Sequence, residues 1–135
     1  MPTTAVFLAS LALGGMVFFS FVIAPLVHRR LPPEHGGPFI REAFSTYYPL
    51  MALLTGMAAL TMPPFWPATI LALIAIGFVL AQLLLRPAVN DLADRRAAGD
   101  LAAAAEFKRL HGISMALNLA QMVALALIVW VAIDR

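Results

Sequence analysis

Cysteine is absent from the sequence, and charged side chains are scarce, because Asp, Glu, Lys and Arg together make up only 12% of the 135 residues. Without cysteine, the chain has no disulfide, no thiolate metal site and no cysteine nucleophile. The sequence also lacks a glycine-rich phosphate loop, a serine nucleophile elbow and a zinc-protease helix motif. No complete catalytic set is visible, so the interpretation leans against an enzyme while leaving that question open.

Two kinds of charge cluster are missing as well. The seven acidic residues all lie in expected loops or near the chain end, so no apolar stretch holds the buried carboxylate that proton-coupled transport uses. The densest basic clusters are adjacent pairs such as Arg29-Arg30 and Arg95-Arg96, which are too short for a nucleic-acid surface. We therefore expect no nucleic acid among the partners.

The chain instead has a large excess of apolar side chains. Hydrophobic residues make up 62% of the sequence, and the mean hydropathy is +0.90. Soluble domains carry roughly twice this charged fraction, and a small domain buries only about two thirds of its surface. The surplus of apolar surface therefore indicates a protein whose principal partner is the lipid bilayer.

Four uncharged stretches are each long enough to cross a bilayer, which takes about 20 helical residues. They are residues 5–27, 43–62, 65–85 and 112–133. The sequence therefore predicts an all-α fold, a polytopic membrane protein in which residues 1–135 form a single antiparallel four-transmembrane-helix bundle. No basic residue precedes the first stretch, which favours a retained span over a signal peptide.

The segment between the third and fourth spans is polar. We expect a cytoplasmic surface helix over residues 91–110, with Asn90 or Asp91 as its N-cap and with Gly99 interrupting it. Asp100 is expected to cap the next helix, and the pattern from Asp100 to Ile133 fits one long helix.

Basic residues predict the orientation of the spans. Eight of the nine lie in residues 28–42 and 86–111. The positive-inside rule places these two loops in the cytoplasm and both termini outside. We expect the bacterial inner (plasma) membrane as the location.

A polar stripe on the fourth span is the most informative chemical feature. Its members are spaced by three, four and three residues, so they share one helix face over about 15 Å of axis: His111, Ser114, Asn118 and Gln121. Such a face should point into the bundle, toward Gln82, Thr55 and either Ser10 or Ser20. One interpretation is a hydrogen-bond network that fixes helix register. The other is a polar cleft, open to the cytoplasm, that binds a small ligand with His111 at its mouth.

Histidine leaves a cofactor site open. His111 is the one weak candidate ligand for haem or a metal ion, and His28 and His35 lie on the same expected side of the membrane. Tyr47 and Tyr48 open the second span and are interpreted as interfacial anchors.

Small residues and one proline predict how the helices pack. Small residues let helices approach closely in lipid, and they recur at Ser10 and Gly14, at Ala52 and Gly56, and along Ala116, Ala120 and Ala124. We interpret these as contacts within the bundle, with docking of a partner chain as the alternative. Pro25 should kink the first helix or end its regular part.

Several stretches together resemble a known family. The first span carries Gly14-Gly15 and later Ala24-Pro25, Arg86-Pro87 precedes Asn90, and the most specific stretch reads Phe107-x-x-Leu110-His111-Gly112-x-Ser114-x-x-x-Asn118. This resembles the family of transmembrane protein 205 and its bacterial four-span relatives, a domain of unknown function. The resemblance implies four spans and directs attention to Gly15, Phe19, Pro25, Asn90, His111, Ser114 and Asn118.

Three functions remain as hypotheses. The first is a non-enzymatic membrane protein with a ligand-binding or transport-accessory site formed by His111, Ser114, Asn118, Gln121 and Gln82. The second is an accessory subunit of a larger energy-transducing or transport complex, in contact with other membrane subunits or with a second copy of itself. The third is a haem- or metal-dependent redox protein centred on His111.

Overall fold

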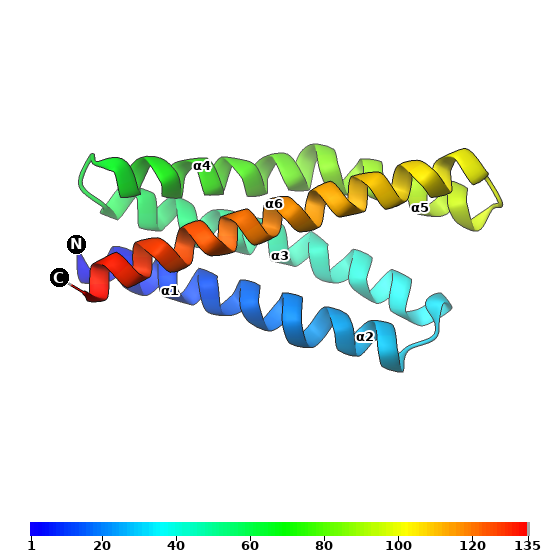
Figure 1. The fold of residues 1–135 in the computed structure, drawn as a ribbon, viewed down its shortest axis with the longest axis horizontal. Coiled ribbons are helices and arrows are strands. Elements are labelled where there is room, and N and C mark those ends of the chain that lie inside the picture. Colours follow the sequence, from blue (N-terminus) through cyan, green and yellow to red (C-terminus); the bar gives the residue numbers. More distant parts are fainter. Residues whose placement is uncertain (135) are drawn as a thin grey trace.

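The computed structural model describes residues 1–134 and contains four long helices that run alternately up and down (Figure 1). The first comprises α1 (Thr3–Phe18), the π-helical segment η1 (Phe19–Ile23) and α2 (Ala24–Arg30). The second is α3 (Pro33–Thr61). The third comprises α4 (Trp66–Leu80), the π-helical segment η2 (Ala81–Leu85) and α5 (Arg86–Ala97), and the fourth is α6 (Leu101–Ile133).

All four helices are long and apolar enough to cross a membrane, and no strand occurs among residues 1–134. Large apolar side chains cover the outside of the bundle; Leu60, for example, is 88% exposed. Water would penalise such a surface, whereas lipid would not. The all-α fold, the four-helix membrane bundle and the integral membrane character expected from the sequence are therefore confirmed.

On α1, the small residues that are buried in the bundle core differ from the ones expected. Ala5, Ala9 and Ala12 are fully buried on α1, at helical spacing. Gly15 allows the Met51 side chain of α3 to lie close to the α1 backbone, because a Cβ placed at Gly15 would lie 3.0 Å from the Met51 methyl carbon. A Cβ at Gly14, in contrast, would have nothing within 4 Å. Gly14 was thus wrongly predicted to pack inside the bundle; Ala116 and Ala120 were as well, since both are exposed.

Each of the two π-helical segments ends two residues before a proline. Proline has no N–H and its ring clashes with the carbonyl four residues back, which disrupts the regular bonding pattern. The chain responds by widening one turn: the Ala24 N–H donates to the Phe19 carbonyl, five residues back. The Arg86 N–H does the same with the Ala81 carbonyl before Pro87. Pro25 therefore ends the regular part of the first helix, as expected, while the helix itself continues to Arg30.

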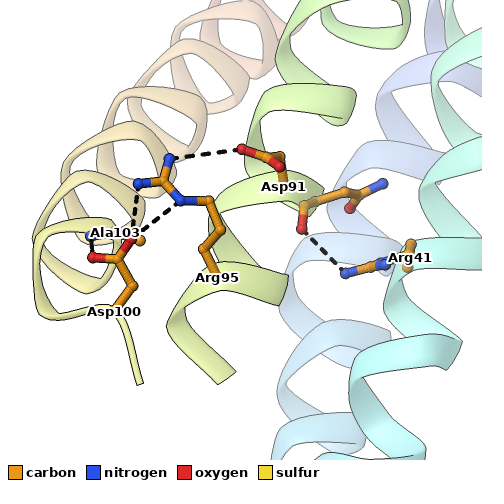
Figure 2. Close-up of polar contacts among 6 residues, drawn as sticks. Arg41, Asp91, Arg95, Asp100 and Ala103 are labelled. Atoms are coloured by element: carbon orange, nitrogen blue, oxygen red, sulfur yellow. Dashed lines mark hydrogen bonds and ion pairs between the residues drawn. The ribbon is translucent and has the colours of Figure 1, made fainter. Parts of the chain in front are cut away.

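A turn at residues 98–100 interrupts the expected segment 91–110 at Gly99, as expected, so that its first part belongs to α5 and its second part to α6. Gly99 adopts φ +92°, a backbone conformation that favours glycine. Asp100 then caps α6 by accepting a hydrogen bond from the Ala103 N–H at 3.1 Å (Figure 2). The helix that Asp100 caps continues to Ile133, as expected. Asn90 is not a cap, since it lies inside α5.

Ion pairs hold the polar end of this α5–α6 hairpin (Figure 2). Arg95 donates to the Asp100 carboxylate at 2.8 Å. The hydrogen bond from the Ala103 N–H, together with this bond from Arg95, keeps the pKa of Asp100 below its usual value. Arg41 on α3 reaches across to α5, where it contacts Asp94 at 2.7 Å and the Asn90 carbonyl at 3.4 Å. The bond from Arg41 lowers the pKa of Asp94. The second and third helices are thus tied together at this end.

Candidate ligand-binding cleft

A cleft of about 460 Å³ opens between the first helix and α6, with α3 contributing a third wall. α6 packs against α1, and Figure 1 shows α6 and α2 separating toward the end opposite the chain termini. The lining residues come from three helices: Phe19, Ser20, Phe21, Ala24, Pro25 and His28; Phe44, Tyr47 and Tyr48; His111, Met115, Ala116, Asn118, Leu119 and Met122. Its size is that of a small-molecule pocket.

Three polar side chains from three helices meet in the wall of this cleft. The Tyr47 hydroxyl donates to Asn118 Oδ1 at 3.1 Å, and Asn118 Nδ2 donates to Ser20 Oγ at 3.0 Å. Ser20 lies within η1, so the widened turn that Pro25 imposes also sets the direction of its hydroxyl. The chain Tyr47–Asn118–Ser20 therefore depends on a local backbone feature of the first helix.

An aromatic cluster forms the wall beside this hydrogen-bond chain. The rings of Phe19 and Tyr47 stack with centroids 4.7 Å apart, Phe44 meets Phe19 edge-on at 5.1 Å, and Phe44 stacks on Tyr48 at 5.0 Å. Tyr47 and Tyr48 are only 6% and 8% exposed. Their interpretation as interfacial anchors is therefore wrong; they belong to the core, because their ring edges and faces are occupied by Phe19, Phe44 and Phe78.

Two histidines line the cleft, His28 from α2 and His111 from α6. The His111 ring stacks on Phe107 with centroids 5.7 Å apart, and the Arg96 guanidinium lies 3.9 Å from the Phe107 centroid. Within residues 1–134 no three His, Cys, Asp or Glu side chains lie close enough to hold a metal ion. His35 does not join His28 and His111 in a metal-binding group, so the cleft offers a haem or metal ion two imidazoles at most.

The polar stripe on the fourth helix is divided between two environments. His111 and Asn118 line the cleft, whereas Gln121 is buried and donates to the Ile74 carbonyl on α4 at 3.3 Å. Gln121 reaches that carbonyl over Gly77, where a Cβ would lie 2.7 Å from its Nε2 atom. Ser114 is half-buried near the Tyr48 phenol and does not line the cleft.

Of the residues expected to be hydrogen-bond partners of the polar stripe, some contact it and others do not. Ser20 is the partner of Asn118, but the Thr55 hydroxyl donates to the Met51 carbonyl of its own helix at 2.7 Å. Gln82 lies outside the cleft, and its buried Oε1 has no hydrogen-bond partner among residues 1–134. Phe19 and Pro25 line the cleft, whereas Gly15 packs on Met51 and Asn90 lies beside Arg41.

The sequence did not reveal that α3 supplies a wall of the cleft, or that Gly77 on α4 makes room for Gln121. Phe44, Tyr47 and Tyr48 recur at spacings of three and four, and the same face continues through Met51, Thr55 and Ala58, all buried. This periodicity was available as a signal that the tyrosines face inward. Gly77 gave no such signal, because its role depends on the approach of a side chain from another helix.

Comparison with known proteins identifies one family. The family described as a domain of unknown function (DUF4149) matches residues 7–98, a range that begins within α1, includes the second and third helices and ends before α6. The finer resemblance to the transmembrane protein 205 family is not confirmed and stays a prediction. No curated protein and no solved structure matches the chain.

Proposed function

The chain belongs to the DUF4149 family, and we propose that it is a non-enzymatic membrane protein that binds a small ligand within the bilayer. The ligand site is the cleft between the first helix and α6. Ligand binding of this kind suits a receptor, a carrier or a transport-accessory protein, and function lies in the site and not in the four-helix fold itself.

One observation carries this proposal: the chain Tyr47–Asn118–Ser20 lies in the wall of an open cleft. A hydrogen bond that serves only to fix helix register belongs in a packed region, and Gln121 with its bond to Ile74 is of that kind. Polar groups that converge on an otherwise apolar and aromatic cavity are the usual mark of a ligand site.

The test is gentle purification of the whole chain, followed by solvent extraction and mass analysis of any small molecule that comes with it. We expect a molecule at a fixed ratio to the protein, and we expect Asn118→Leu to lose it. Leu127→Ala on the lipid-facing side of α6 is the matched control, because Leu127 is 57% exposed and does not line the cleft. Wild type and Asn118→Leu preparations with the same extract would overturn the proposal.

The location and orientation belong to the same proposal. Residues 28–42 and 86–111 carry most of the basic charge, which supports a bacterial inner membrane protein with these loops in the cytoplasm and both termini outside. In that orientation His28 and His111 lie at the cytoplasmic end of the cleft, and the bond between Asn118 and Ser20 lies deeper in the membrane.

A second candidate function is an accessory subunit of a larger membrane complex. Ala120 on α6 is exposed and does not line the cleft, and Gly14 on α1 has open space around it. Exposed small residues on a helix surface suit the close approach of a helix from another chain. Purification from native membranes with identification of associated proteins tests this idea: a chain that elutes alone from mild detergent would contradict it.

A further inference from the structure

The hydrogen-bond chain in the cleft leaves donor groups unused. Asn118 donates one N–H to the Ser20 oxygen, so the Ser20 hydroxyl hydrogen and the second Asn118 N–H remain. Hydroxyls on helices commonly donate to a carbonyl three or four residues back, as Ser45, Thr55 and Thr61 all do here. Ser20 makes no such bond among the described residues. The deep end of the cleft is therefore prepared for an acceptor atom on a ligand.

Formal charge is missing from the cleft wall. None of the lining residues is an Asp, Glu, Lys or Arg. A cationic ligand would need a carboxylate and an anionic headgroup would need a guanidinium or ammonium, because a buried unpaired charge is costly. The lining therefore favours a neutral ligand that accepts hydrogen bonds.

The second set of donors lies at the other end of the cleft. A neutral imidazole carries one N–H donor, and both His28 and His111 line the cleft. The seven residues from His111 to Asn118 correspond to about 10 Å of helix axis at 1.5 Å per residue. Two hydrogen bonds of about 3 Å each leave about 4–5 Å between them, which accommodates one six-membered ring with an oxygen on each side.

The walls between these two ends suit a flat ring with an apolar tail. Phe19, Phe44, Tyr47 and Tyr48 supply aromatic surface, and aromatic rings pair by offset stacking or edge contacts. At the rim, Phe21, Met115 and Leu119 are 63%, 61% and 53% exposed on the lipid-facing surface. A tail can leave between them directly into the bilayer, so the ligand has no need to pass through water.

From these features we propose that the cleft binds a lipid-soluble quinone, a neutral planar ring with carbonyl acceptors on opposite edges and an apolar tail. Ser20 and Asn118 donate to one carbonyl, and His28 or His111 donates to the other. This inference rests on the proposed ligand site and adds the chemical class of its occupant.

The experiment uses the whole purified chain in lipid nanodiscs, into which decylubiquinone is titrated as a fraction of the lipid. Binding to the folded state raises the unfolding temperature, and we expect a saturable rise. Decylbenzene has the same tail and a ring without oxygens, so it should give no rise. Ser20→Ala removes one hydrogen bond and should weaken decylubiquinone binding about 3- to 10-fold.

Ser10→Ala is the matched control, because Ser10 lies on the same helix, is half-buried and does not line the cleft; its affinity should equal that of the wild type. An equal rise with decylbenzene, or no effect of Ser20→Ala, would overturn the quinone assignment. Oleic acid is added as a probe of other lipophiles. Binding of oleic acid but not decylubiquinone would leave the proposed ligand site standing and remove the quinone, whereas no response to any probe, with nothing co-purified, would remove both.

Discussion

Gly77 and Gly14 are two helical glycines whose surroundings differ completely. A Cβ at Gly77 would lie 2.7 Å from Gln121 Nε2, whereas a Cβ at Gly14 would meet nothing within 4 Å. Both positions are helical, so replacement by alanine brings the same gain in helix propensity, up to about 1 kcal/mol. The difference between the two replacements therefore isolates the contact between Gln121 and Ile74.

We predict that Gly77→Ala is less stable than Gly14→Ala by about 0.5–2 kcal/mol, the worth of an interhelical hydrogen bond in a membrane protein. The alanine methyl displaces the Gln121 amide from the Ile74 carbonyl. Denaturant unfolding in mixed micelles measures the two free energies of unfolding. Equal values would show that the Gln121 side chain finds another acceptor at no cost.

At the scale of the helices, Pro25 determines where the first helix widens. The π-helical segment η1 holds both Phe19 and Ser20, two of the residues that line the cleft. A widened turn changes the angular position of every side chain on one side of it relative to the other. The cleft geometry is thus linked to a residue that makes none of its hydrogen bonds.

We predict that Pro25→Ala restores regular bonding in the first helix and turns Ser20 away from Asn118. Because the chain has no cysteine, a Ser20→Cys, Asn118→Cys pair can be crosslinked without background, and the yield should fall when Pro25→Ala is added. Pro87→Ala relaxes η2, which lies outside the cleft, and should leave the yield unchanged. A yield that survives Pro25→Ala would show that packing, and not proline, holds the wide turn.

The start of α6 gives a prediction that depends on pH. The folded chain lowers the pKa of Asp100, so its carboxylate stabilises the cap above the unfolded value of about 3.9 and loses that contribution as pH falls through the folded value. Amide hydrogen exchange near Ala103 should be slow at pH 7 and, after correction for the intrinsic rate, less protected at pH 3.

Asp100→Ala should abolish this pH dependence and leave the first turn of α6 poorly protected at pH 7. Asp91→Ala provides the control, because Asp91 contacts Arg95 only at 3.8 Å and caps nothing. Protection at Ala103 that is the same in both variants would assign the cap to another group.

At the scale of the whole molecule, the two loops rich in basic residues lie at one end of the bundle, and the termini lie together at the other (Figure 1). We predict that a single cysteine placed by His35→Cys or Ala98→Cys reacts with an impermeant thiol reagent only from the cytoplasmic side. Pro64→Cys, in the turn between α3 and α4, should react only from the outside. Labelling of all three from one side would contradict the four-span topology.

The number of membrane-spanning helices could be predicted from the sequence, but the arrangement of the residues around the cleft could not. Hydropathy alone located the four spans, because each needs only a long uncharged stretch. Asn118 and His111 were found as polar residues on one helix face, but the same argument grouped Ser114 and Gln121 with them. The widened turn before Pro25 shifts Ser20, and a helical wheel with a fixed period cannot show such a shift. Tyr47 was interpreted as an interfacial anchor because it is a tyrosine near the end of a span, and its four-residue spacing from Met51, which places both on one buried helix face, was not used.

The helices that form the cleft are synthesised in a fixed order. Ser20 and Tyr47 lie on the first two helices, and their shared partner, Asn118, lies on α6, the C-terminal one of the four. During synthesis the ribosome delivers α6 after the other three, so until then two hydroxyls lack the partner that they have in the folded chain. The family match at residues 7–98 covers this earlier portion alone. The first three helices thus hold two walls of the cleft, and the arrival of α6 supplies the third.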